Sequence, residues 1–323
     1  MRPTSLSVVI PVYNSERTIA ETVARLLAVL EARAVPFEII LVNDGSQDRS
    51  WEIVARLTRE RPEVLGIDLS RNYGQHNALL CGILACRHDV IVTLDDDLQH
   101  PPEEIPKLLA KLEEGYDVVY GAAEREPHGW WRRAGSRLTK RVLACILGEE
   151  MGRGVSAFRA FRISLREAFR DYRSPAVLID VLLSWSTTRF TTIPVIHQPR
   201  HVGVSNYTVR RLVAHAVNLL TGFSTRPLRF ASWVGFGSIV FGMLVLAWVI
   251  GNYLIRGTSQ PGFPFLASII AIFAGAQLFA LGILGEYVGQ VHRRLMDKPP
   301  YVVRSKLGAG DDHDRRATQK DAA

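Results

Sequence analysis

The sequence predicts an α/β protein in which a mostly parallel sheet, flanked by helices, precedes two membrane-spanning helices. Short apolar runs alternate with amphipathic helical segments over the first 120 residues, which is typical of parallel strands joined by right-handed crossovers. The apolar run at residues 90–94 ends in three successive aspartates, which indicates a ligand site at a strand end. Two long apolar stretches then occupy residues 230–290, each long enough to span a hydrocarbon core of about 30 Å.

The composition narrows the class of protein and of partner. The chain has 323 residues, 47% of them apolar, so one large domain with an appendage is expected. Its net charge of +7 indicates an acidic partner, such as nucleic acid, an anionic membrane surface or phosphorylated substrates. The three cysteines lack metal-ligand spacing and leave an odd thiol, so they are expected to be reduced, buried cytosolic cysteines. No signal peptide is expected, because residues 1–5 lead directly into a strand.

The elements follow from apolar runs and their spacing. Apolar residues at helical spacing predict helices over residues 19–30 and 51–57. Another helix is expected after Pro101 and Pro102, because proline is tolerated in a first helical turn. Pro194 makes the last strand an edge strand, since proline has no N–H for a sheet interior. The predicted strands are residues 6–12, 37–42, 64–69, 90–94, 116–120 and 191–196.

Polar residues follow the predicted strands at their carboxyl ends, where parallel sheets bind ligands. Tyr13 follows the first strand, Asp44 the second, residues 71–76 the third and residues 95–97 the fourth. The loop after the first strand reads PVYNSE and contains no glycine-rich phosphate fingerprint. This argues against a dinucleotide-binding dehydrogenase and against a P-loop kinase.

The aspartates at residues 95–97 require a compensating cation. Adjacent carboxylates at the end of a buried strand repel one another and resist removal from water. Mg²⁺ or Mn²⁺ held by oxygen ligands is the simplest compensation, and such a cleft suits a diphosphate whose charge the ion carries. The alternative interpretation is a solvated acidic turn.

Five motifs together resemble the family-2 glycosyltransferases of GT-A fold. They are VVIPVYN, VNDGS, RNYGQH, DDDLQHPPEE and RHVGVSNY, and the resemblance extends from Leu6 to about Arg304. Within this family the chain resembles the polyprenyl-phosphate glycosyltransferases. These include dolichyl-phosphate mannose synthases, GtrB-type glucosyltransferases and undecaprenyl-phosphate 4-deoxy-4-formamido-L-arabinose transferases, of which the last look most similar.

The resemblance implies a nucleotide-sugar site at the sheet rim. Pro11, Tyr13 and Asp44 match the nucleobase pocket of the family. Asp95 and Asp97 match its D-x-D motif, which holds the metal ion and the ribose-diphosphate end of the donor. The residues alone leave a packing role open for Tyr13 and a local turn role for Asp44.

Further donor contacts are implied outside the nucleobase pocket. Gln99 matches a polar residue near the donor sugar, and Arg200 and Ser205 match residues of the family's R-x-x-G-x-S-K-Y motif at the diphosphate. Asn206 replaces the lysine of that motif, which removes a cationic contact. Asp96 is expected to be structural, because relatives often have a small uncharged residue at its position.

The resemblance also implies an acceptor-phosphate site. Arg132 and Ser136 match the Arg-x-x-x-Ser spacing that grips the acceptor phosphate in dolichyl-phosphate mannose synthases, and Arg159 matches a family arginine. Ala157 stands where GtrB-type enzymes have an aspartate, and Arg153 where arabinose-type enzymes have an acid. A protein base is therefore not assigned, and a phosphomonoester with a second pKa near 6 does not require one.

The remaining segments predict a membrane protein. Paired tryptophans and arginines at residues 130–141, and basic residues before an apolar face at 208–229, are typical of interfacial helices. Basic residues flank the outer ends of the two spans, which predicts a multi-pass protein of the cytoplasmic membrane with both termini cytosolic. The expected parts are a cytosolic catalytic domain, an interfacial helix, a transmembrane hairpin and a cytosolic tail disordered at its end, at residues 1–207, 208–229, 230–290 and 291–323.

The expected function is inverting, metal-dependent transfer of one sugar from a nucleotide-sugar to a polyprenyl (undecaprenyl-type) phosphate at the cytosolic face. Inversion and a homotetramer are implied by the resemblance, and nucleic acid is not an expected partner. One alternative is a membrane scaffold of the same fold without turnover, which Asn206 and Ala157 motivate. The other, less favoured, is a processive polysaccharide synthase, which needs a larger membrane channel and a Q-x-x-R-W segment, neither of which appears in the sequence.

Overall fold

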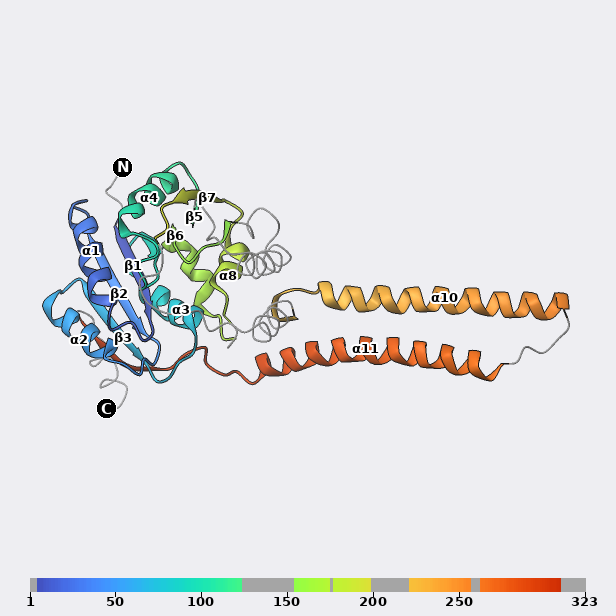
Figure 1. Cartoon of the computed structure of the whole chain (residues 1–323). Helices are drawn as coiled ribbons and strands as arrows, with labels where there is room; N and C mark the ends of the chain where they lie inside the picture. Colours follow the sequence, from blue (N-terminus) through green and yellow to red (C-terminus); the bar gives the residue numbers. More distant parts are fainter. Residues whose placement is uncertain (1–4, 124–153, 175–176, 199–220, 257–261, 309–323) are drawn as a thin grey trace. The chain divides into compact units, whose positions relative to one another are not determined.

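A computed structural model of the chain describes residues 5–123, 154–174, 177–198, 221–256 and 262–308 (Figure 1). The chain divides into two compact units, the first of Met1–Thr208 with Asp297–Ala323 and the second of Val209–Met296. The first contains a sheet with its covering helices, and the second contains two long helices. The C-terminal segment therefore belongs to the unit that contains the sheet.

The described part of the first unit is built on a mixed sheet of eight strands, in the order β7-β5-β6-β4-β1-β2-β3-β8. Strands β4, β1, β2 and β3 pair in parallel, as do β5 and β7, whereas β6 and β8 run antiparallel to their neighbours. The mostly parallel sheet is thus confirmed at its centre, and Pro194 lies in an edge strand as predicted. The strands are β1 Leu6–Val12, β2 Phe37–Asn43, β3 Val64–Leu69, β4 Val90–Thr93, β5 Val118–Ala123, β6 Arg159–Arg162, β7 Phe190–Val195 and β8 Val303–Leu307.

Helices cover both faces of this sheet (Figure 1). On β1, Val8 and Ile10 belong to one buried cluster and Val9 to the other, so the strand is buried on both sides. Such a strand must be apolar throughout, which is why an unbroken apolar run predicted it. The first cluster includes α1 Ile19–Glu31, α2 Ser50–Glu60 and α4 Ile105–Glu113, and the second includes α3 Gln75–Ala85, α7 Glu167–Arg170 and α8 Ile179–Ser186. The 3-10 turns η1 Pro102–Glu104 and η2 Ile163–Arg166 precede α4 and α7.

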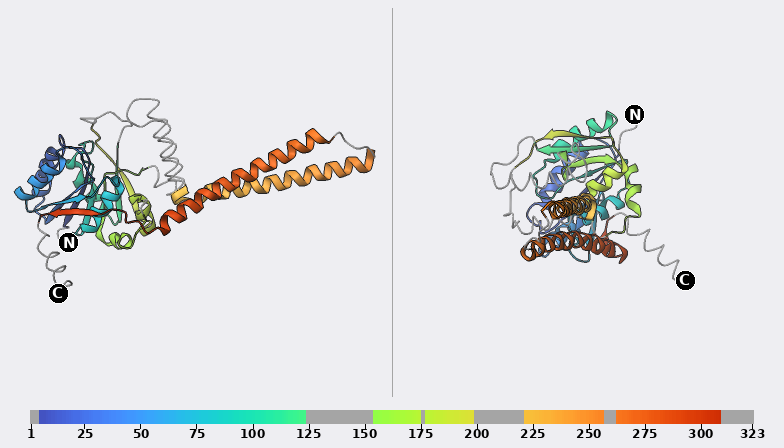
Figure 2. Two further views of the ribbon diagram at one scale, coloured as in Figure 1. Left: turned by 90° about the horizontal axis from the view of Figure 1, so that it is seen from below. Right: turned by 90° about the vertical axis from the view of Figure 1, so that its right-hand side faces the viewer.

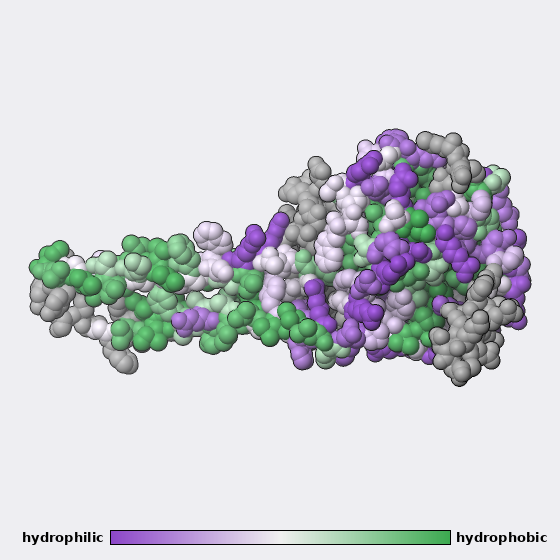
Figure 3. Space-filling model, turned by 180° about the vertical axis from the view of Figure 1, so that it is seen from behind, coloured by the Kyte–Doolittle hydropathy of each residue, from purple (hydrophilic) through white to green (hydrophobic). Residues whose placement is uncertain are grey.

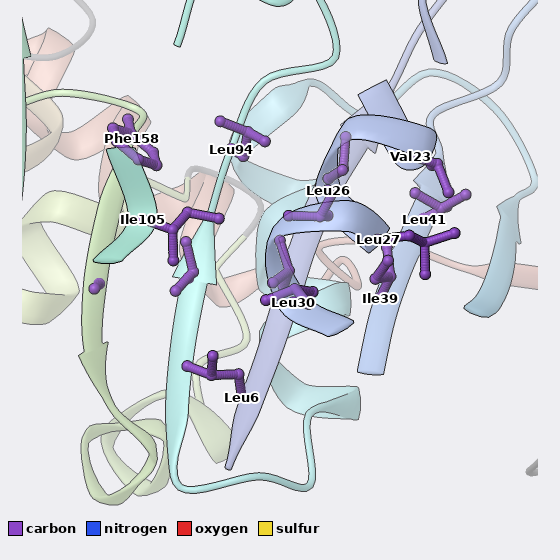
Figure 4. Packing of buried hydrophobic residues seen from close by; sticks show 14 of the residues in the cluster. Leu6, Val23, Leu26, Leu27, Leu30, Ile39, Leu41, Leu94, Ile105 and Phe158 are labelled. Carbon is purple, nitrogen blue, oxygen red and sulfur yellow. The ribbon is translucent and has the colours of Figure 1, made fainter. Parts of the chain in front are cut away.

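Helix α1 shows how helical spacing produces this packing (Figure 4). Val23, Leu26 and Leu30 recur every three or four residues and are fully buried, in one cluster with Ile39 and Leu41 of β2. Burying a side chain of this size stabilises the fold by about 1.5–3 kcal/mol. The helix is therefore held mainly by its apolar face against the sheet.

Strand β8 is the largest departure from the predicted fold. The sequence predicts a tail at residues 291–323, whereas Val303–Leu307 pairs antiparallel with β3. Its half-buried residues alternate with the exposed Arg304 and Lys306, which is the period of a strand covered on one face. Because basic side chains occupy alternate positions, the segment lacks the apolar run by which the other strands were predicted. At a sheet edge such side chains also oppose pairing with other chains.

The second unit is a pair of helices, α10 Arg226–Arg256 and α11 Phe263–Leu295, which lie side by side (Figure 2). The rings of Phe230 and Phe279 are 6.4 Å apart, and a Cβ at Gly242 would lie 2.9 Å from the ring of Phe273. Many large apolar side chains are exposed along both helices (Figure 3). Length and composition make both helices candidate membrane spans. The pair extends slightly beyond the predicted bounds of 230–290, because α10 begins at Arg226 and α11 ends at Leu295.

Candidate active site

A pocket lies at the carboxyl ends of β1, β2 and β4. The parallel pairing of β1 with both β2 and β4 brings separate stretches of sequence to this rim. Five predicted site residues meet here, namely Pro11, Tyr13, Asp44, Asp95 and Asp97. The pocket has a volume of about 240 Å³ and is lined by Pro11, Val12, Tyr13, Asp44, Asn72, Gly74, Gln75, Asp95, Asp96 and Asp97.

Asp44 follows β2 and is only 3% exposed. Its carboxylate accepts the N–H groups of Tyr73 at 2.7 Å and of Gly74 at 2.9 Å. Burial raises the pKa of Asp44, and the two N–H donors act in the opposite direction. A carboxylate offers about four acceptor positions, so it has capacity for a ligand as well. Asp44 therefore holds the loop after β3, which goes beyond the turn role left open by the sequence.

Two glycines beside Asp44 adopt backbone conformations that favour glycine, and one of them also allows close packing. Gly45 has φ of +66° and Gly74 has φ of +97°, in the left-handed region that favours glycine. A Cβ at Gly45 would lie 2.6 Å from backbone atoms of Arg71 and Asn72. The turn after β2 and the loop after β3 therefore pack backbone against backbone, and this contact shapes one wall of the pocket.

Asp95 and Asp97 lie in the turn after β4, and each is oriented by an N–H donor. Gln75 Nε2 donates to Asp95 Oδ1 at 2.6 Å, and the Gln99 N–H donates to Asp97 Oδ1 at 3.1 Å. Among the described residues, no three His, Cys, Asp or Glu side chains are placed to hold a metal ion by themselves. Mg²⁺ is commonly bound through one or two carboxylates together with substrate phosphates and water. Two aspartates in one pocket therefore fit an ion that is shared with a substrate.

Asp96 connects the ends of β1 and β4. Its carboxylate accepts the hydroxyl of Ser15 and the N–H of Tyr13, the latter at 3.3 Å. Its backbone carbonyl accepts the Thr22 hydroxyl at 3.3 Å. Burial raises the pKa of Asp96 to about 6, and the Ser15 hydroxyl acts against this rise. These contacts agree with the structural role expected for the middle aspartate.

The turn after the aspartates is tied to the segment that follows β7. The carbonyl of Gln99 accepts the N–H of Gln198 at 2.8 Å. Gln99, which was predicted near the donor sugar, is not among the residues that line the pocket. The buried His100 ring stacks on Phe158 with a centroid separation of 5.4 Å and meets the edge of His197 at 4.9 Å. Burial, assisted by His197, lowers the pKa of His100 to about 4, so this ring is neutral at physiological pH.

Arg159 begins β6 opposite Thr93, the last residue of β4, but its side chain is buried and not open to the acceptor phosphate predicted for it. Its side chain is 1% exposed and forms a buried ion pair with Asp180 of α8. Arg159 Nε also donates to the Thr93 hydroxyl at 3.1 Å, and Tyr120 donates to Asp180 at 3.2 Å. A buried charge needs a partner, and here the partner is internal. The signal for this pair was Asp180 itself, an acid within the apolar run of α8.

Several predicted residues lie outside the described part of the chain. Residues 124–153 contain the predicted acceptor-phosphate pair, and residues 199–220 contain the predicted diphosphate contacts and the replaced lysine position. These residues are Arg132, Ser136, Arg200, Ser205 and Asn206. In the described part, Asn72, Gly74 and Gln75 also line the pocket; the sequence predicts residues 71–76 at this rim but assigns them no role.

A family model and curated relatives match most or all of the described catalytic part of the chain. Residues 7–172 match the model for Glycosyl transferase family 2. The chain is 35% identical over 311 residues to the undecaprenyl-phosphate 4-deoxy-4-formamido-L-arabinose transferase of Serratia proteamaculans (strain 568), with 95% of both chains covered. It is 39% identical over 306 residues to the protein of that name from Shewanella sediminis (strain HAW-EB3), with 94% and 92% covered. A solved glucosyl-3-phosphoglycerate synthase from Mycobacterium tuberculosis is 21% identical, with a TM-score of 0.49 over 68% of this chain and 78% of the other.

Proposed function

The chain belongs to glycosyl transferase family 2, and from this premise we propose that it transfers one sugar from a nucleotide-sugar to a polyprenyl (undecaprenyl-type) phosphate. The observation that carries the proposal is the pocket in which Asp44, Asp95 and Asp97 converge. Curated relatives that span nearly the whole chain are named for transfer involving undecaprenyl phosphate. The two candidate membrane helices are in keeping with a lipid acceptor.

In this proposal the nucleotide occupies the pocket, with its base beside Pro11 and Tyr13. The Tyr13 side chain is 47% exposed, which leaves ring surface for stacking on a base. Asp44 accepts hydrogen bonds from the nucleoside with its remaining acceptor capacity. Mg²⁺ or Mn²⁺ held by Asp95 and Asp97 would supply charge stabilisation for the departing nucleoside diphosphate.

The acceptor phosphate serves as the nucleophile. With a second pKa near 6, a phosphomonoester is largely a dianion at neutral pH, so no protein base has to remove a proton. One of its oxygens bonds to the anomeric carbon while the bond from that carbon to the donor diphosphate breaks, which inverts the configuration.

We assign the acceptor phosphate to Arg132 and Ser136 and the donor diphosphate to Arg200 and Ser205, because guanidinium and hydroxyl groups bind phosphate oxygens. Gln99 is assigned to the donor sugar.

We also propose that the protein is located in the cytoplasmic membrane. Arg226 and Arg229 precede the predicted first span, and Arg256 alone is basic in the link. Four basic residues follow the second span, namely His292, Arg293, Arg294 and Lys298. This distribution favours a multi-pass protein of the cytoplasmic membrane with the catalytic unit and both termini cytosolic. A homotetramer is the assembly that the resemblance suggests, and it is included here as a proposal.

Incubation of membranes containing the chain with polyprenyl phosphate and a panel of labelled nucleotide-sugars tests this function. Thin-layer chromatography should show a lipid-linked monosaccharide for one donor, and chelation of divalent ions should abolish it. Asp97→Ala should lose the product, whereas Asp171→Asn, at an exposed position after α7, should keep it. Growth of the product beyond one sugar would favour a processive synthase. No product from any donor would favour the scaffold.

A further inference from the structure

The segment that follows α11 packs against the element that carries part of the pocket. Residues 303–307 form β8 on β3, and the carbonyl of Val302 accepts the Ser70 N–H at 2.9 Å. Further back, the Pro300 carbonyl accepts Asn77 Nδ2 at 2.7 Å, in the first turn of α3. The loop between β3 and α3 is therefore bounded on both sides by contacts with residues 300–302.

Arg304 links this segment to a buried polar pair beneath the rim. Its guanidinium donates to the Ser70 carbonyl at 2.7 Å and to Asp68 Oδ2 at 3.4 Å. The other oxygen of the buried Asp68 accepts Asn43 Nδ2 at 2.7 Å, and Asn43 immediately precedes Asp44. A buried carboxylate is stable only when it is paired or hydrogen-bonded, so Arg304 and Asn43 together satisfy Asp68.

The loop held in this way forms one wall of the pocket. Its residues Asn72, Gly74 and Gln75 line the pocket, and the N–H groups of Tyr73 and Gly74 bind Asp44. Gln75 then reaches Asp95 at 2.6 Å. A displacement of this loop would alter the surroundings of both the predicted nucleobase residue and the predicted metal ligand.

We propose that residues 299–307 are a positioning element of the donor pocket and that Arg304 is its central positioning residue. Without this segment, β3 would be an open edge and the backbone groups of Ser70 would lose their protein partners. The segment thus sets how tightly the β3–α3 loop closes on a nucleotide-sugar. The assignment of the ligand rests on the proposed function, whereas the mechanical link between Arg304 and the loop does not.

Hydrogen–deuterium exchange on the full chain in detergent tests the mechanical link. Arg304→Ala should raise the exchange rate of amides in residues 70–75 by about threefold or more, a modest factor because the Arg304 side chain is 62% exposed. Arg304→Lys should give an intermediate rate, because lysine retains the charge without the planar fork that reaches two acceptors. If the alanine variant does not fold, the lysine variant alone decides.

Arg61→Ala is the matched control, since it also removes an exposed arginine. Arg61 pairs with Glu31 at 3.2 Å and precedes β3 at the end opposite Ser70. This variant should leave exchange in residues 70–75 unchanged. An Arg304→Ala protein that is folded and exchanges like the wild type in this loop would overturn the proposal.

Kinetics with the donor that the panel of nucleotide-sugars selects provides the second readout. Arg304→Ala should raise the KM for the nucleotide-sugar about threefold, while kcat changes less than about twofold, because binding surroundings change and the reacting groups do not. A fall in kcat with unchanged KM would contradict a positioning role. If the wild type transfers no sugar, the proposed function fails, and the exchange experiment still decides the link.

Discussion

Two residues of the pocket, Asp44 and Gln75, form hydrogen bonds that position neighbouring pocket residues. Asp44 was predicted from a strand end, and its bonds to the loop after β3 give it a second task. Gln75 was expected at the rim, but its hydrogen bond to Asp95 was not predicted, because the two residues meet only where two loops share one rim of the sheet. Arg159 is the converse case, since its family motif suggested a phosphate ligand while its partner Asp180 lies elsewhere in the sequence.

The contact between Gln75 and Asp95 gives the first prediction. With Asp95 as the proposed metal ligand, Gln75→Ala should raise the Mn²⁺ concentration needed for half-maximal sugar transfer by about tenfold, because the outer partners of metal ligands typically contribute 10- to 100-fold to metal affinity. Mn²⁺ titration followed by electron paramagnetic resonance should show the same weakening without turnover. Gln47→Ala, at an exposed position, should leave both values unchanged. Equal Mn²⁺ affinity in Gln75→Ala and the wild type would contradict the role.

The buried ring of His100 gives a prediction for acid stability. Its folded-state pKa of about 4 lies below the usual 6.5, so the unfolded chain binds a proton between these values that the folded chain does not. Stability should therefore fall as pH drops from 6.5 towards 4, by about 2 kcal/mol from this group. His100→Phe retains a ring for stacking on Phe158 and should lose less stability over this range. Denaturant unfolding at pH 7 and pH 4.5 measures the difference, and identical losses would exclude His100 as a cause.

Among the elements, strands with a signal in their own sequence were predicted best. Strands β1 to β4, buried on both faces and therefore largely apolar, were predicted to within about a residue, and so was the edge strand β7, expected at residues 191–196. β8 was missed because its exposed positions carry Arg304 and Lys306, and only its partner β3 makes it a strand. Bounds that depend on local apolar content were thus predictable, whereas an edge strand that depends on a distant partner was not.

The packing of β2 under α1 can be tested with a matched pair of isoleucine substitutions. Ile39 is fully buried in β2, whereas Ile196, just after β7, is 54% exposed. Ile39→Ala should lower the free energy of unfolding by about 2–5 kcal/mol, because it removes buried methyl groups and leaves a cavity. Ile196→Ala should cost less than about 1 kcal/mol. Thermal unfolding in detergent measures both, and similar costs would mean that β2 does not carry the core as described.

At the scale of the whole molecule, two candidate membrane helices separate the last strand of the sheet from the other seven along the sequence. β7 and β8 are the two edge strands, and α10 and α11 lie between them in the sequence. The apolar spans were predictable from length and composition alone. The return of the chain to the sheet was not, because residues 296–302 carry no signal for where they go.

Topology reporters provide the prediction at this scale. A green fluorescent protein fused after Ala323 should fluoresce, and alkaline phosphatase at that position should be inactive, because both termini are proposed to be cytosolic. Alkaline phosphatase inserted in the link, at residues 257–261, should be active. The reverse pattern would place the catalytic unit away from the cytosolic nucleotide-sugars and would overturn the proposed localisation.

The position of β8 has a consequence for the order in which the protein is made. Synthesis proceeds from the N-terminus, so β1 to β7 emerge before α10 and α11, and β8 emerges last. With the role proposed for Arg304, the β3–α3 loop stays incompletely held until both helices have left the ribosome. A chain still in synthesis would then bind nucleotide-sugar weakly, and full affinity would arise only once its membrane segments exist.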